Sequence, residues 1–234
     1  MLAIFKREFK SFFTTPLGYV ILIIFNVFSG IYFWFGTLYS DTVDMTYVFS
    51  GFTIIVLSAM PILTMRLLSE ERRQKTDQAL LTAPVSLVGI VLSKFFAAFL
   101  LYLIGISVTL VYSVVLAFIA QPTWSYILGN YLGLILLGAA LISVGLFISS
   151  ITENQLVAAI VSYATMFFLL MVDSIAKLFP VQFISDLFYD LSFQTRYDSF
   201  VSGVVSLDNV MFFLSATVIC LFLTTRVMEK RRWS

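Results

Sequence analysis

Long apolar runs separated by short polar segments dominate this chain of 234 residues and predict helices that cross a membrane. A helix needs roughly 20 apolar residues to span the hydrocarbon core, and several uncharged runs reach that length. Residues 95–152 contain no charge over 58 positions, more than twice one crossing, so we expect a turn at Gln121–Pro122–Thr123. The six predicted spans are approximately 17–39, 46–66, 94–120, 125–150, 156–176 and 207–225.

Two further segments are amphipathic rather than uniformly apolar. In residues 2–16, four phenylalanines and a leucine repeat at helical spacing opposite Lys6, Arg7 and Lys10, which predicts an N-terminal interfacial helix. A cleaved signal peptide is the alternative, but the next apolar run is too long and lacks a small-residue cleavage site. In residues 181–206, apolar side chains that repeat every four residues predict an amphipathic helix on the outer surface.

The composition supports helices in a membrane over other fold classes. Hydrophobic residues make up 60% of the chain and the mean hydropathy is +1.01, which excludes an ordinary soluble domain. A β-barrel fits poorly, because its strands would show segments of about ten residues with alternating polarity. The sequence therefore predicts an all-α, polytopic membrane protein with six transmembrane helices, forming a single domain over residues 1–234.

The basic residues are distributed unevenly between the two sides of the predicted membrane. Of the 14 Lys and Arg residues, only Lys177 and Arg196 fall on one side and the other 12 fall on the opposite side. The positive-inside rule makes the basic side cytoplasmic, which places both termini and the loop 67–86 in the cytoplasm. The net charge of +1 gives no reason to expect a nucleic-acid partner.

The residue types present exclude several kinds of chemistry. Histidine is absent and Cys220 is the only cysteine, which removes intrachain disulfides, clustered metal ligands and histidine acid–base catalysis. No G-x-x-x-x-G-K-[ST] loop occurs, so we expect this chain to bind no cofactor or metal and to be no nucleotide-hydrolysing enzyme. The ionisable residues nearest the spans, Lys94, Glu153, Asp173 and Lys177, lie at predicted ends, which argues against an ion-coupled carrier.

Small residues are frequent in the predicted fourth span. Gly129 and Gly133 are four residues apart, and five more small residues follow up to Gly145. Such spacing lets neighbouring helices approach closely. We expect this span to pack against helices of the same subunit, and a seam between two subunits is the alternative.

The longest polar segment, Ser69–Gln78, lies between two apolar runs. A charged loop that only fixes topology is one interpretation. The other is a mechanical lever, because Thr76 and Asp77 can cap a short helix over Gln78–Ala83 before Pro84.

The segment Glu71–Ser86, which reads ERRQKTDQALLTAPVS, resembles the cytoplasmic loop of ABC-2 type transporter permeases. That loop follows approximately E-[RK]-x-x-G-T-x-E-x-L-L-x-x-P-[VI]-S, and the next span opens with a lysine, here Lys94. Lys75 stands where the family commonly has glycine, and Gln78 where it commonly has glutamate. The FKREF run of residues 5–9 and the C-terminal span and basic tail extend the resemblance to the short six-span members, which include the gliding-motility-associated permease subunit.

The resemblance implies a non-catalytic subunit of the bacterial plasma (inner) membrane, working as an exporter. It implies two kinds of partner: ABC ATPase subunits, on which ATP and Mg²⁺ bind, and a second permease that is either an identical copy or a paralogue. The loop between the second and third spans would be the coupling helix. The implied contact residues are Glu70, Glu71, Arg72, Gln74, Lys75, Thr76, Asp77 and Gln78, with a second, smaller contact at Thr152, Glu153, Asn154 and Gln155.

Three functions remain open from the sequence. The first is a permease subunit that couples ATP hydrolysis by a separate ATPase to substrate translocation. The second is a scaffold or mechanotransmission subunit of an ATPase complex that moves no substrate. The third is a channel or ion-coupled carrier, which the lack of charge within the predicted spans disfavours.

Overall fold

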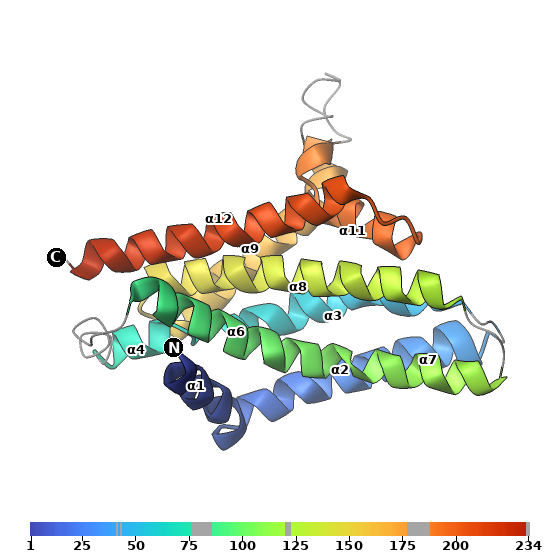
Figure 1. Cartoon of the computed structure of the whole chain (residues 1–234), viewed down its shortest axis with the longest axis horizontal. Coiled ribbons are helices and arrows are strands. Elements are labelled where there is room, and N and C mark those ends of the chain that lie inside the picture. The colour runs from blue at the N-terminus through green and yellow to red at the C-terminus, as the bar shows by residue number, and fades with distance from the viewer. Residues whose placement is uncertain (41, 43, 76–85, 120–122, 177–187, 233–234) are drawn as a thin grey trace.

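The computed structural model describes residues 1–40, 42, 44–75, 86–119, 123–176 and 188–232 (Figure 1). Helices make up the regular structure of these residues, and they contain no strand. The elements are α1 (Leu2–Thr14), α2 (Leu17–Phe33), a π-helical turn η1 (Trp34–Leu38), α3 (Thr46–Thr64), α4 (Ser69–Arg73), α6 (Leu87–Ile106), α7 (Val108–Ile119), α8 (Trp124–Ile151), α9 (Gln155–Ala176), α11 (Phe193–Val201) and α12 (Leu207–Arg232).

Six stretches of the described residues are long and apolar enough to cross a membrane, which confirms the all-α fold with six candidate spans. They are Leu17–Leu38, Thr46–Arg73, Leu87–Phe118, Trp124–Ile151, Gln155–Ser174 and Leu207–Arg232. The third begins about two turns before the predicted residue 94. Ser86 caps α6 there, since its side chain accepts a hydrogen bond of 3.2 Å from the Gly89 amide. Lys94 therefore lies inside α6 rather than at its start.

Helix α8 occupies the centre of the bundle, between α12 on one side and α3, α6 and α9 on the others (Figure 1). Within its apolar stretch 83% of the residues are buried, against 17% for α12. Its small residues make this packing possible. A Cβ atom added at Gly138 would lie 2.0 Å from the Tyr102 ring of α6, and one at Gly145 would lie 2.1 Å from the Thr64 hydroxyl of α3. The expected packing within the subunit is confirmed at these positions.

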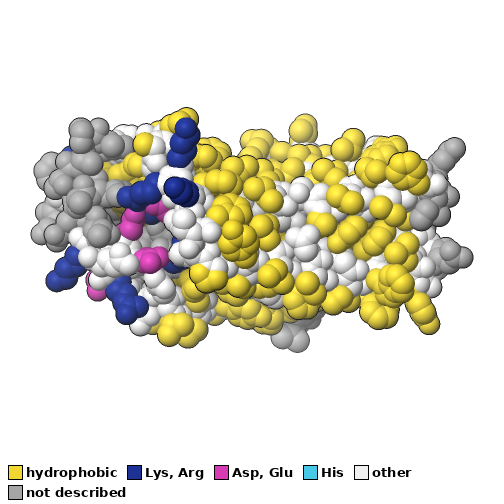
Figure 2. Space-filling model, turned by 90° about the horizontal axis from the view of Figure 1, so that it is seen from below, with side chains coloured by type: hydrophobic (Ala, Val, Ile, Leu, Met, Phe, Trp, Pro, Cys, Tyr) yellow, Lys and Arg dark blue, Asp and Glu magenta, His cyan; other side chains and the backbone are white. Residues whose placement is uncertain are grey.

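The two ends of the bundle differ in chemistry. Helices α1 and α4 and both chain ends lie at one end (Figure 1). Figure 2 shows that the charged side chains on the visible face gather at this end, while hydrophobic side chains cover most of the remaining length. We call it the charged end. It is the end that the sequence predicts to be cytoplasmic.

Helix α11 lies at the opposite end and belongs to the predicted external segment 181–206 (Figure 1). It packs into the bundle: the Tyr197 hydroxyl donates a 2.7 Å hydrogen bond to the Phe49 carbonyl of α3, and Phe200 is fully buried. A Cβ atom at Gly133 of α8 would lie 2.6 Å from Phe200. Residues 181–187 of the predicted amphipathic helix lie outside the described residues, and α11 packs against α3, α8 and α9.

Candidate functional site

Four charged side chains from three helices meet at the charged end. The Lys94 ammonium of α6 lies 3.2 Å from a Glu8 carboxylate oxygen of α1 and 3.0 Å from a Glu71 carboxylate oxygen of α4. An Arg7 guanidinium nitrogen lies 2.7 Å and 2.8 Å from the same two oxygens. Two cations thus alternate with two anions, and we call Arg7, Glu8, Glu71 and Lys94 the four-charge cluster.

Lys94 is the deepest member of this cluster, with 1% of its side chain exposed. A buried ammonium is costly unless it is paired, and Lys94 has two carboxylate partners. Burial raises the pKa of Glu8, but the charges and hydrogen bonds of Lys94 and Arg7 together outweigh burial and hold that pKa below its ordinary value. The pKa of Arg7 is raised, chiefly by its hydrogen bond to Glu8. The cluster therefore favours the charged forms of both α1 residues.

Arg66, two residues after α3, holds the other side of α1. Its guanidinium donates hydrogen bonds to the Thr15 hydroxyl at 2.9 Å and the Ser11 hydroxyl at 3.2 Å, and lies 5.5 Å above the Phe12 ring. It also lies 3.8 Å from the Glu70 carboxylate of α4. Between α1 and α4 a cleft of about 370 Å³ remains, and the charged and polar residues that line it include Arg7, Glu8, Arg66, Glu70, Gln74 and Lys94.

The junction between α3 and α4 is fastened to α8. The backbone amides of Leu68 and Ser69 both donate to the Ser149 hydroxyl at 3.1 Å, and that hydroxyl donates to the Met65 carbonyl at 3.1 Å. Ser149 thus supplies partners for two amides at the start of α4 and for a carbonyl at the end of α3, which these helix ends leave unpaired. As a result, α4 leaves the bundle in a fixed direction.

Helix α4 is also paired with the turn between α8 and α9. The Arg72 guanidinium lies 2.6 Å from the Glu153 carboxylate and donates a hydrogen bond to the Ile151 carbonyl. Asn154 caps α9, because its side-chain oxygen accepts from the Leu156 amide at 2.9 Å. The described part of the first implied ATPase contact, residues 70–75, therefore lies beside the second, residues 152–155.

The structure places the predicted contact residues in different settings. Glu71 and Arg72 are engaged in the ion pairs above, and the Gln74 amide donates to Glu70 at 3.4 Å. Lys75 has a φ of 56°, in the left-handed region that glycine adopts most easily. In the second segment, Thr152 donates to the Ile148 carbonyl at 3.2 Å, Glu153 and Asn154 are exposed, and Gln155 starts α9. Thr76, Asp77 and Gln78, with the helix expected over 78–83, lie outside the described residues.

Sequence reasoning did not single out Arg7, Glu8, Arg66 or Lys94 as site residues. Two signals were available: Glu8 is the only acidic residue among the first 40, and Lys94 is the last charge before 58 uncharged residues. Neither signal reveals the pairing, because the partners lie far apart in the chain. The described residues contain no group of three His, Cys, Asp or Glu side chains that could hold a metal ion.

Comparison with known proteins adds the family. A family model described as "ABC-2 family transporter protein" matches residues 36–227, which is most of the chain. A search of curated proteins gives no match. Membership of this family implies partnership with an ABC ATPase subunit. With its six apolar helices, the chain therefore belongs to the ABC-2 transporter family and is a multi-pass membrane component of an ABC transporter.

Proposed function

We propose that this chain is the permease subunit of an ABC exporter and couples ATP hydrolysis by a separate ATPase subunit to substrate translocation. The observation that carries the proposal is the connection of α4 to the spans. Glu71 of the implied coupling segment pairs with Lys94 of α6. Twelve of the 14 basic residues lie on this side of the predicted membrane, which supports a cytoplasmic position for it.

The charged end offers three routes for a displacement of α4. The first runs through Glu71 and Lys94 into α6. The second runs through Arg72 and Glu153 into the turn between α8 and α9. The third runs through Glu71 and Arg7 into α1. Because packed helices rearrange as units rather than deforming continuously, a push on α4 would shift several spans together.

In this proposal ATP and Mg²⁺ bind to the ATPase, and the chain itself carries no cofactor. It works with a second permease, either an identical copy or a paralogue, in the bacterial plasma (inner) membrane. The coupling surface consists of Glu70, Glu71, Arg72, Gln74, Lys75, Thr76, Asp77 and Gln78, with Thr152, Glu153, Asn154 and Gln155 beside it. The exposed members of this surface among the described residues are Gln74, Lys75, Glu153 and Asn154.

Expression of this chain together with its genomic neighbours, co-purification of any ABC ATPase chain and flux measurements in vesicles test the proposal. We expect the ATPase to bind the wild type, and the double variant Gln74→Glu/Glu153→Lys to bind it less well. The matched control is Gln194→Glu/Asp198→Lys on α11, which alters the opposite end of the bundle. Equal ATPase binding by both double variants would contradict a coupling surface at the charged end. ATP turnover that no candidate substrate changes would favour the scaffold function instead.

A further inference from the structure

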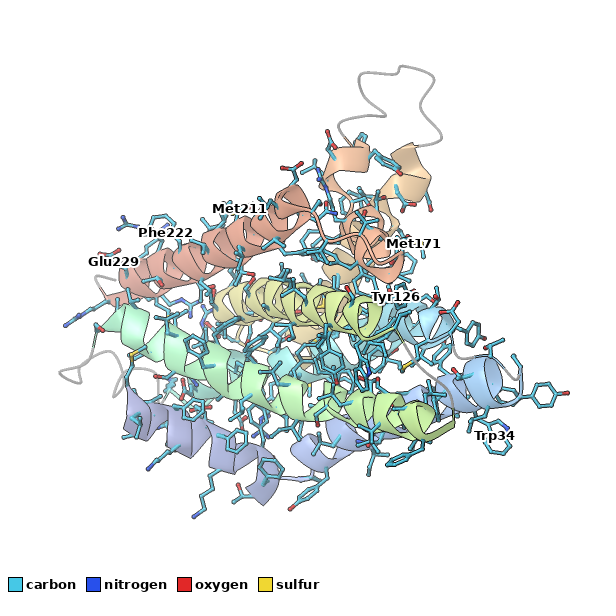
Figure 3. The ribbon with its side chains drawn as sticks, turned by 45° about the vertical axis from the view of Figure 1, so that its right-hand side comes forward. Trp34, Tyr126, Met171, Met211, Phe222 and Glu229 are labelled. Carbon is cyan, nitrogen blue, oxygen red and sulfur yellow. The ribbon has the colours of Figure 1, made fainter. Side chains whose placement is uncertain are left out.

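A surface groove runs between the start of α6 and the C-terminal half of α12, at the charged end. Its volume is about 650 Å³, within the roughly 300–1,000 Å³ of small-molecule sites. One face of α12 lines it, because the lining residues recur every three or four positions. They include Val218, Leu221, Phe222, Arg226, Glu229 and Arg232. Figure 3 labels Phe222 and Glu229 on this part of α12, near the first turns of α6.

The groove changes from apolar to cationic along its length. Helices α6 and α12 run in opposite directions, so Val91 and Leu92 lie toward Val218, while Ser86 lies toward Arg232 (Figure 1). The part of the groove farther from the charged end is apolar on both walls. The mouth, at the charged end, is lined by Arg226 and Arg232. This gradient follows the direction in which a bilayer changes from hydrocarbon to headgroups.

The arginine at the mouth is held in place by its neighbours. The Arg226 guanidinium lies 4.9 Å above the Phe222 ring and 2.7 Å from the Glu229 carboxylate. Glu229 compensates the charge of Arg226, so Arg232 leaves the mouth with a net positive charge. The first turn of α6 opens at the same mouth, and the N-terminus of a helix carries partial positive charge. The mouth therefore favours an anion.

We propose that this groove binds one anionic phospholipid from the leaflet at the charged end. An acyl chain would lie along the apolar walls, where Val88 and Phe222 are 53% and 54% exposed. The phosphate and headgroup would lie at Arg226 and Arg232, because guanidinium groups bind phosphate oxygens with two parallel hydrogen bonds. Basic pockets between membrane helices on the cytoplasmic side recognise anionic headgroups in this way. A choline headgroup would instead bring a third cation to the mouth.

Thermal unfolding of the full-length chain in neutral detergent, with added phosphatidylglycerol or phosphatidylcholine of matched acyl chains, tests the proposal. We expect phosphatidylglycerol to raise the unfolding midpoint saturably, and phosphatidylcholine to raise it much less. In Arg226→Gln/Arg232→Gln the half-saturating phosphatidylglycerol concentration should increase by roughly tenfold or more, since each interfacial cation contributes to anionic-lipid binding. The Arg226–Glu229 pair is exposed, so we expect the variant to fold.

Two further variants separate a specific groove from general charge attraction. Lys6→Gln/Lys10→Gln removes the same number of charges from the exposed side of α1 and should leave the lipid effect unchanged. Val88→Phe keeps both arginines but fills the groove from its exposed edge, so it should also weaken the effect. Equal effects of the two lipids, equal losses in both charge variants, or full binding by Val88→Phe would each overturn the proposal. Release of bound phosphatidylglycerol when the ATPase joins the chain would assign the groove to a protein partner instead.

Discussion

Replacing Lys94 by Met is the most direct test of the four-charge cluster. Methionine fills a similar volume and removes the ammonium that lies between Glu8 and Glu71. The Glu8 and Glu71 side chains are only 13% and 16% exposed, so water cannot fully replace the lost partner. Breaking a buried ion pair costs about 3–5 kcal/mol, and we expect about 3 kcal/mol because Arg7 still contacts both carboxylates.

The stability lost in Lys94→Met should also depend on pH, in a direction that follows from the pKa of Glu8. In the wild type the pKa of Glu8 is lowered, so Glu8 contributes stability that is present above its unfolded pKa and is lost as the pH falls through its folded pKa. Without Lys94, burial of Glu8 is less well compensated and its pKa moves up. The stability that the variant lacks at pH 7 should therefore be partly regained at pH 5. The difference between wild type and variant should narrow on acidification.

Thermal unfolding of the purified chain in detergent at pH 7 and pH 5 measures both effects. By the scaling for domains of 150–250 residues, about 3 kcal/mol lowers the midpoint by roughly 6–12 °C. The matched control is Lys10→Met, an exposed lysine of α1, which should shift the midpoint little. Lys94→Met/Glu71→Gln restores charge balance with Arg7 and Glu8 and should recover at least half of the loss. The reasoning is refuted if Lys94→Met is as stable as Lys10→Met, or if its deficit grows at pH 5.

Three further predictions follow from the geometry. Lys75→Gly removes the steric cost of a left-handed backbone at a residue with a side chain and should stabilise the chain by about 0.5–1 kcal/mol in thermal unfolding. Gln74→Gly, at a φ of −84°, should not stabilise it. Equal effects of the two substitutions would show that the backbone at Lys75 is unstrained. Gly138→Val places atoms against the Tyr102 ring and should lower the free energy of unfolding by about 1–3 kcal/mol. Gly30→Ala, whose Cβ would lie 3.5 Å from the Tyr112 hydroxyl, should be tolerated. Similar unfolding midpoints for the two variants would argue against tight packing of α6 on α8. A double-mutant cycle of Arg72→Gln and Glu153→Gln should give a coupling of only about 0.2–1 kcal/mol in stability, because Glu153 is 65% exposed. The same pair should reduce ATP-driven flux in the complex with the ATPase, and unchanged flux would remove this route from the coupling surface.

The sequence by itself determined the six apolar spans and the gathering of basic residues on one side of the predicted membrane. Both follow from local composition, because a helix in a bilayer satisfies its own backbone hydrogen bonds and needs only enough apolar residues to cross. The start of the third span was determined less well, at residue 94 from the sequence and at Leu87 in the structure. An apolar run shows where a helix can lie in hydrocarbon, and the cap at Ser86, which starts α6 before Lys94, depends on one hydrogen bond.

The tertiary structure decided how the charged end is assembled. Lys94 appeared in the sequence as a charge at the margin of a span, yet it is buried between Glu8 of α1 and Glu71 of α4. Likewise, Arg72 and Glu153 belong to separate polar turns that the folded chain brings within 2.6 Å. Ion pairs between distant segments leave no periodic signal, because their energy depends on three-dimensional distance and burial. Composition fixed which segments are apolar enough to cross the membrane, whereas packing around α8 fixed which of their residues are buried and which charges meet.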